Sequence, residues 1–264
     1  MSLLSAIILG VVQGLTEFLP VSSSGHLVLG QSLLNVSETG LVFEVAVHLG
    51  TLLAVTIFYR KDLYELILSL PTLKKPDFQN DPRHNLILAL AIVTVITGIV
   101  GVSGKSFFEG LFSEPKIVSG LLIATGLFLI ATRFIRDNAS EGGRITPLQA
   151  IIVGLAQSTA ILPGISRSGA TISAGLFAGV GREEAARLSF LAMIPAVFGA
   201  ALLEAKDITS FEGSQVAIVI AGLVVSSIVG YGALALLIRF VKRGKLFIFG
   251  PYCITVGVLG LLFL

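Results

Sequence analysis

The chain has 264 residues, of which 54% are hydrophobic and only 13% are charged, and its mean hydropathy is +0.94. This composition excludes a soluble globular protein, because the polar residues are too few to cover a core of this size. It predicts an all-α integral membrane protein. The net charge of +2 gives no indication of a nucleic-acid partner, and none is expected.

Six apolar stretches are near the length of about 20 residues that a membrane-spanning helix needs. In chain order they lie at 41–59, 86–104, 117–132, 188–203, 213–238 and 246–264. The segment 60–85 is rich in charge and proline, and it is expected to be a solvated connection. The prediction is therefore a single membrane domain, 1–264, with six transmembrane helices.

A sequence repeat precedes each group of three spans. Residues 6–30 return 144 positions later as residues 150–175. Identical residues at this offset include Gln13 and Gln157, Ser22 and Ser166, Ser24 and Ser168, and Gly25 and Gly169. Only the first copy carries Glu17, and only the second carries Arg167, so the copies differ where chemistry is expected.

Each copy has two short apolar arms around a Pro/Gly/Ser break, at 18–25 and at 162–169. An arm of about a dozen residues forms roughly 18 Å of helix, well short of the ~30 Å hydrocarbon core. Each copy is therefore either one broken helix that crosses or a re-entrant hairpin. With re-entry, fourteen Lys and Arg residues lie on one side and three on the other, against nine and eight if both copies cross. The positive-inside rule favours re-entry, with the basic side cytoplasmic.

The predicted architecture is an inverted-topology repeat in which a re-entrant helical hairpin and three spans occur twice. Repeat 1 covers about 1–135 with its hairpin at 6–30, and repeat 2 covers about 145–264 with its hairpin at 150–180. Both termini are expected outside, and the two hairpin tips are expected to meet near the middle of the bilayer. Irregular backbone at that depth indicates a polar pocket.

The two breaks carry the candidate catalytic groups. Glu17 and Arg167 are ionisable side chains inside apolar segments, where each costs several kcal/mol unless it is paired or wet. Ser23 and His26 lie close by in the first break. A carboxylate, a hydroxyl, an imidazole and a guanidinium together can transfer a phosphoryl group. These four residues are predicted to be catalytic, with a buried ion pair that only joins the hairpins as the alternative.

Further polar groups at the breaks are predicted to bind a phosphate-containing substrate, since hydroxyls and backbone N–H groups at a helix start suit an oxyanion. Helix capping is the alternative role for the serines. The predicted binding residues are Gln13, Ser22, Ser24, Gly25, Ser166, Ser168 and Thr171. Glu44 and His48 share one face of the first span, where they either complete the pocket or pack between helices.

The segments QGLTEFLPVSSSGH at 13–26, FEVAVHLGT at 43–51 and LPGISRSGAT at 162–171 resemble sequences of the undecaprenyl-diphosphate phosphatase family of the bacitracin-resistance type. The resemblance extends over essentially the whole chain. It implies hydrolysis of undecaprenyl diphosphate to undecaprenyl phosphate, the lipid carrier for peptidoglycan, at the outer face of the bacterial inner membrane. The family's essential glutamate, serine, histidine and arginine correspond to Glu17, Ser23, His26 and Arg167.

The same resemblance implies a divalent cation, Mg²⁺ or Ca²⁺, with Glu17 as its protein ligand. The family motif begins with Glu or Gln, and here it begins with Gln13, so a carboxylate pair is absent. Glu17 then acts alone, with phosphate oxygens as further ligands. The expected partners are a polyprenyl diphosphate and membrane lipids. The sequence leaves open a homodimer, and it leaves open whether Glu17 or His26 is the base.

A second function class fits the same pattern. Inverted repeats with broken helices at the middle of the membrane are the usual design of secondary transporters, so a transporter or a polyprenyl-phosphate flippase is the alternative. Phosphate release in detergent would favour the enzyme, and headgroup movement without hydrolysis would favour the transporter.

Overall fold

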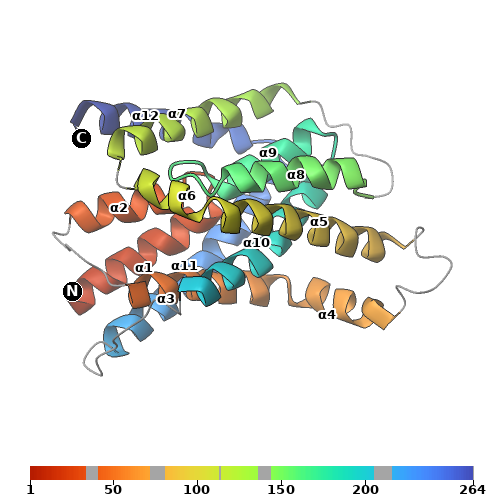
Figure 1. Ribbon diagram of the computed structural model, residues 1–264, viewed down its shortest axis with the longest axis horizontal. Coiled ribbons are helices and arrows are strands. Elements are labelled where there is room, and N and C mark those ends of the chain that lie inside the picture. Colours follow the sequence, from red (N-terminus) through yellow and green to blue (C-terminus); the bar gives the residue numbers. More distant parts are fainter. Residues whose placement is uncertain (34–40, 72–80, 113, 136–143, 205–215, 264) are drawn as a thin grey trace.

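The computed structural model describes residues 1–33, 41–71, 81–112, 114–135, 144–204 and 216–263 (Figure 1). Within these ranges every regular element is a helix, which confirms the all-α prediction. Six helical segments of 18–27 residues there are long and apolar enough to cross a membrane, as predicted. They are α3 Leu41–Phe58, α5 Pro82–Ser103, α7 Pro115–Ala131 continued by η3 Thr132–Phe134, α10 Arg182–Glu204, α11 Val216–Lys242, and η6 Leu246–Ile248 continued by α12 Phe249–Phe263.

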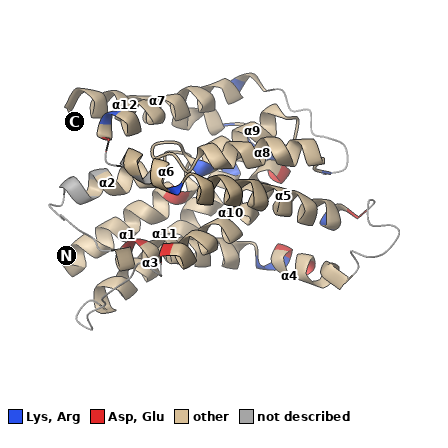
Figure 2. Ribbon diagram, viewed as in Figure 1, with Lys and Arg blue, Asp and Glu red and all other residues tan. Residues whose placement is uncertain are grey.

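Shorter helices precede the first span and lie between later spans. They are α1 Leu3–Phe18, α2 Ser23–Leu33, α4 Arg60–Ser69, α6 Lys105–Phe112, α8 Pro147–Thr159 and α9 Arg167–Phe177. The connection predicted at 60–85 thus begins with a helix, α4, whose Leu66 is buried against the protein. Its part at 72–80 lies outside the described residues. Charged residues are sparse along the long helices and are more frequent in α4 (Figure 2).

The two repeated segments form helical pairs, α1 with α2 and α8 with α9. Ser2 caps the start of α1 by accepting a hydrogen bond from the Ser5 N–H, and the helix ends two residues before Pro20. Helix α8 starts with a capping box between Thr146 and Gln149. The two pairs extend from opposite ends of the molecule, and their connecting turns lie toward its middle (Figure 1).

The helices of the two halves pack on one another with exchanged partners. Helix α1 packs on α11 and α8 packs on α5, while α3 packs on α11 and α10 packs on α5. Helix α3 also contacts α10, and α7 runs along α12. Each short pair is therefore held by the middle span of the other half. The core between them includes the fully buried Phe18, Phe190 and Leu234.

Helices α3 and α11 are in close contact at Gly50, where a Cβ atom would overlap Ser226 Oγ and the Leu223 carbonyl. Ser226 Oγ also donates to the Val47 carbonyl at 3.0 Å. We expect Gly50→Ala to lower the free energy of unfolding by about 1–3 kcal/mol, because it overpacks this contact. Gly98→Ala is the control, since nothing lies within 4 Å of its Cβ position, and it should be neutral or stabilising. Equal melting temperatures of the two variants in detergent would contradict the close packing.

Candidate active site

The local sequence of each tip starts a helix in the middle of the protein. In the first tip, Pro20 follows α1, and Ser22 takes a left-handed conformation with φ +69° directly before α2. In the second tip, Gly164 has φ +97°, and Ser166 caps α9 by accepting a hydrogen bond from the Gly169 N–H at 3.2 Å. Helix N-termini carry unpaired N–H groups and positive partial charge, so both tips suit an anion.

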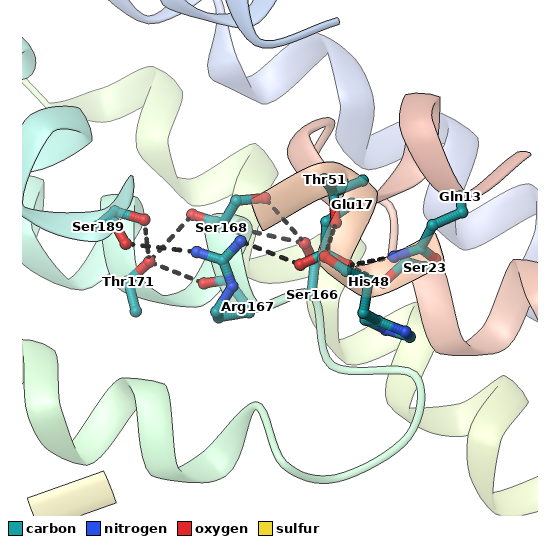
Figure 3. A network of polar contacts seen from close by, with 11 residues as sticks. Gln13, Glu17, Ser23, His48, Thr51, Ser166, Arg167, Ser168, Thr171 and Ser189 are labelled. Atoms are coloured by element: carbon teal, nitrogen blue, oxygen red, sulfur yellow. Dashed lines mark hydrogen bonds and ion pairs between the residues drawn. The ribbon is translucent and has the colours of Figure 1, made fainter. Parts of the chain in front are cut away.

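Glu17, in the last turn of α1, is the centre of the polar site (Figure 3). Its Oε1 pairs with Arg167 Nη2 of the other hairpin at 3.2 Å, with side-chain exposures of 7% for Glu17 and 14% for Arg167. Its Oε2 accepts hydrogen bonds from Ser23 Oγ at 2.6 Å and from Gln13 Nε2 at 3.2 Å. The structure therefore brings together the predicted Gln13, Glu17, Ser23 and Arg167 from both repeats.

Two residues of α10 also contact the Arg167 side chain. Its Nη1 donates to the Ser189 carbonyl at 3.3 Å, and its guanidinium carbon lies 5.9 Å from the centre of the Phe190 ring. Phe190 in turn packs against Phe18 and Tyr59. Sequence reasoning missed both α10 residues, because Ser189 is one hydroxyl in an apolar span. The guanidinium is thus oriented before any substrate arrives.

The predicted hydroxyls of the second tip are all buried. Ser166 Oγ and Ser168 Oγ lie 3.4 Å apart at the start of α9. Thr171, one turn further along, shares a 2.6 Å hydrogen bond with Ser189 Oγ and donates to the Arg167 carbonyl at 2.8 Å. Thr171 therefore joins α9 to α10, while Ser166 and Ser168 lie beside the helix start.

The remaining predicted residues of the first tip are arranged differently. Ser22 Oγ and Ser24 Oγ lie 3.3 Å apart, and Gly25 packs beside α7. His26 uses both ring nitrogens elsewhere: Nδ1 contacts the Ser22 carbonyl at 2.9 Å, and Nε2 contacts Tyr252 Oη at 2.7 Å. The hydrogen bonds of its ring therefore lead to its own turn and to α12, whereas Ser23 is bonded to the Glu17 carboxylate.

His48 of α3 and Gln157 of the second repeat were also named in the sequence, His48 as a pocket or packing residue and Gln157 as the counterpart of Gln13. His48 Nδ1 contacts the Glu44 carbonyl at 2.8 Å, and the buried Thr51 donates to the His48 carbonyl at 2.9 Å (Figure 3). Gln157, which corresponds to Gln13, donates to Thr97 of α5 at 3.1 Å. The two glutamines therefore have different partners, and only Gln13 contacts a carboxylate.

A divalent cation would find two oxygen ligands at this site. Among the described residues, no three His, Cys, Asp or Glu side chains lie close enough to hold a metal ion. Glu17 supplies one carboxylate, and Gln13 Oε1 is a buried acceptor with no hydrogen-bond partner. Carboxylate and amide oxygens are ligands that Mg²⁺ and Ca²⁺ prefer. Gln13 and Glu17 therefore supply oxygen atoms of the type that a divalent cation binds.

Thr125 of α7, which the sequence did not single out, holds the second tip through two hydrogen bonds. Its hydroxyl donates to the Gly164 carbonyl at 3.0 Å and accepts from the Ser166 N–H at 3.2 Å. We expect Thr125→Val to lower the free energy of unfolding by about 1–3 kcal/mol, because two buried backbone groups lose their partner. Thr56→Val is the control, since that hydroxyl contacts only the Leu52 carbonyl of its own helix. Denaturation of both variants in detergent checks this, and equal stabilities would contradict this role of Thr125.

Comparisons with known proteins agree with the resemblance noted in the sequence. Residues 6–259 match the family model described as bacitracin resistance protein BacA. Undecaprenyl-diphosphatase of Desulforapulum autotrophicum is 40% identical over 271 residues, covering 99% of this chain and 98% of the relative. The proteins of the same name from Desulfosudis oleivorans and Syntrophotalea carbinolica are 45% and 42% identical and cover 96% and 97% of both chains. The chain therefore belongs to the bacitracin resistance protein BacA family.

Proposed function

We propose that this membrane protein is a phosphatase that hydrolyses undecaprenyl diphosphate to undecaprenyl phosphate and inorganic phosphate. The observation that carries the proposal is the cluster at Glu17, whose carboxylate accepts the Ser23 hydroxyl at 2.6 Å and pairs with Arg167 of the other repeat. Near full-length similarity to proteins named undecaprenyl-diphosphatase supports it. The proposed role is to supply the lipid carrier for peptidoglycan and to confer bacitracin resistance.

The diphosphate binds where α2 and α9 begin, and the polyprenyl tail stays in the lipid. Backbone N–H groups at the two helix starts and the Ser166 hydroxyl surround its oxygens. Arg167 offers a planar pair of N–H groups that matches two phosphate oxygens. Because the contact of Arg167 with Phe190 and the Ser189 carbonyl leaves it oriented, little reorganisation is needed as charge develops on the phosphoryl group.

Ser23 is the nucleophile and Glu17 is its base. The short Ser23–Glu17 hydrogen bond already points the hydroxyl proton at the carboxylate. As Ser23 Oγ bonds to the terminal phosphorus, its proton passes to Glu17, and the bridging P–O bond breaks so that undecaprenyl phosphate leaves with the electron pair. Water then attacks the phosphoserine and the P–Oγ bond breaks. Ser23 takes back the proton held by Glu17, and both hydrogens of the water leave on the inorganic phosphate as H2PO4⁻.

A divalent cation, Mg²⁺ or Ca²⁺, is part of the proposal, with Glu17 and Gln13 Oε1 as its protein ligands. When bound, it would neutralise charge on the phosphate oxygens. Gln13→Glu adds a carboxylate one helical turn from Glu17, so we expect half-maximal activity at about tenfold less Mg²⁺. Titration of chelator-treated protein with Mg²⁺, followed by cation binding as well as by turnover, measures this. The same Mg²⁺ requirement in both proteins would contradict the ligand assignment.

The proposed orientation puts the end of the molecule that holds α4 in the cytoplasm of a bacterial cell, with the active site opening to the outer side of the inner membrane. Both termini then lie outside and both hairpins re-enter. The arms α1 and α8 have 16 and 13 residues, whereas each helical segment counted as a span has at least 18. In a Cys253→Ser background, an impermeant maleimide outside the cells should label Lys105→Cys and spare Lys242→Cys. The reverse pattern would contradict this orientation.

A secondary transporter or flippase is favoured by one observation, the exchange of packing partners between the halves. Vesicles that contain purified protein and a polyprenyl diphosphate with a labelled headgroup separate the two functions. The phosphatase releases inorganic phosphate from accessible substrate. Headgroup movement across the vesicle membrane without phosphate release would instead indicate transport and contradict the proposed hydrolysis.

A further inference from the structure

Tyr252, in the first turn of α12, makes a direct contact with a predicted catalytic residue of the other repeat. Its hydroxyl lies 2.7 Å from His26 Nε2, and the two rings stack with centres 5.6 Å apart and planes 13° from parallel. Tyr252 is 48% exposed, so it forms the outer side of this contact. Residues 226 positions apart in the chain therefore meet at the first tip.

The other ring nitrogen of His26 fixes the direction of this hydrogen bond. The left-handed Ser22 turns its carbonyl toward α2, where it accepts the His26 backbone N–H at 3.3 Å and contacts Nδ1 at 2.9 Å. A carbonyl oxygen can only accept, so Nδ1 carries a hydrogen. In the neutral imidazole Nε2 is then the acceptor, and the Tyr252 hydroxyl donates to it.

Helix α12 packs closely on α7 and also contacts the first tip. Gly126 of α7 and Gly250 of α12 lie so close that a Cβ atom on either would overlap the other's carbonyl. Next to Tyr252, the buried Cys253 donates from Sγ to the Pro20 carbonyl at 3.4 Å. Two consecutive residues of α12 thus contact the same tip, one at Pro20 and one at His26.

We propose that Tyr252 is a positioning residue for the phosphatase reaction and acts through His26. Its hydroxyl occupies the Nε2 lone pair and fixes the ring against the Ser22 carbonyl, next to Ser23, so that the Ser23 proton has Glu17 as its acceptor. The inference rests on the proposed function. It assigns α12, the last helix of the second repeat, a part in arranging the first tip.

Tyr252→Phe tests this role, because it removes the hydroxyl and keeps the ring that stacks on His26. We expect a loss in kcat/KM of about three- to tenfold. His26→Gln removes both ring contacts, including the one that holds the Ser22 carbonyl beside Ser23, so it should lower kcat/KM by more. The double variant should be no slower than His26→Gln alone, because Tyr252 acts only through His26. Losses that multiply in the double variant would overturn the proposal. Tyr64→Phe, exposed on α4, is the control and should match the wild type.

A second readout does not depend on activity. Diethyl pyrocarbonate reacts with the lone pair of an imidazole nitrogen that carries no hydrogen. In the wild type, the lone pair of His26 Nε2 accepts the Tyr252 hydroxyl. His26 should therefore react several-fold faster in Tyr252→Phe than in the wild type. Modification is mapped by mass spectrometry on the full-length protein in detergent, with His48 of the same molecules as reference. An unchanged His26 rate would overturn the Tyr252 contact. Absence of phosphate release from the wild type would contradict the proposed function, so the two failures are distinguishable.

Discussion

Replacement of Arg167 by Ala is expected to lower kcat by about 10²–10³-fold, the loss typical of removing one preorganised donor that stabilises transition-state charge. Its side chain is largely buried, its guanidinium pairs with Glu17, and its guanidinium carbon lies over the Phe190 ring. Arg83→Ala is the control, because Arg83 pairs with Asp81 on the exposed surface and should not affect turnover. The measurement is phosphate release from a polyprenyl diphosphate by purified protein.

A loss of folding must be separated from a loss of chemistry in Arg167→Ala. Removing the guanidinium leaves Glu17 as an unpaired buried charge, which costs about 3–5 kcal/mol. The variant that combines Arg167→Ala with Glu17→Gln removes this charge, so its stability should recover while its turnover stays low. Turnover close to that of the wild type in a folded Arg167→Ala protein would show that Arg167 only joins the hairpins.

Ser23→Ala is expected to reduce turnover by at least about 10³-fold, because enzymes that lose their nucleophile keep only the rate due to binding and electrostatics. Ser24→Ala is the matched control on the neighbouring residue, whose hydroxyl contacts Ser22 and not Glu17. We expect a loss within about tenfold for Ser24→Ala. Rapid acid quenching followed by mass spectrometry should find phosphate on Ser23 of the wild type.

The same experiment decides between two forms of the chemistry. Near-full turnover in Ser23→Ala would contradict a covalent step and would favour direct attack by water, with Ser23 as a binding group. Phosphate trapped on another serine of the first tip would contradict the assignment of the nucleophile. In the direct reaction, Glu17 would be the base for the attacking water. Its carboxylate already accepts hydrogen bonds from Ser23 and Gln13.

The sequence predicted the parts of the fold that depend on local pattern. Apolar length predicted six spans, and the structure has six helical segments of suitable length among its described residues. The Pro/Gly/Ser breaks predicted where α1 and α8 end. The prediction that the two tips meet placed Glu17 close to Arg167, because each is too costly to bury alone. The two side chains form an ion pair.

Contacts between distant spans were beyond sequence reasoning. Tyr252, Thr125 and Ser189 each look ordinary in an apolar helix, and their importance depends on which helices lie side by side. His26 was predicted beside Ser23 by its spacing, but its ring bonds to Ser22 and Tyr252 instead. The segment 60–85 was interpreted as a solvated connection because of its charge and proline, whereas its first part forms α4, which contacts α5 and buries Leu66.

The most direct test of the central claim is phosphate release from a polyprenyl diphosphate by purified wild type, Glu17→Gln and Glu183→Gln. Glu183 pairs with Lys242 at an exposed position, so its variant controls for the loss of one carboxylate. The account predicts release by the wild type and by Glu183→Gln and a loss of at least about 10²-fold in Glu17→Gln. Equal release by all three proteins would contradict an active site built around Glu17.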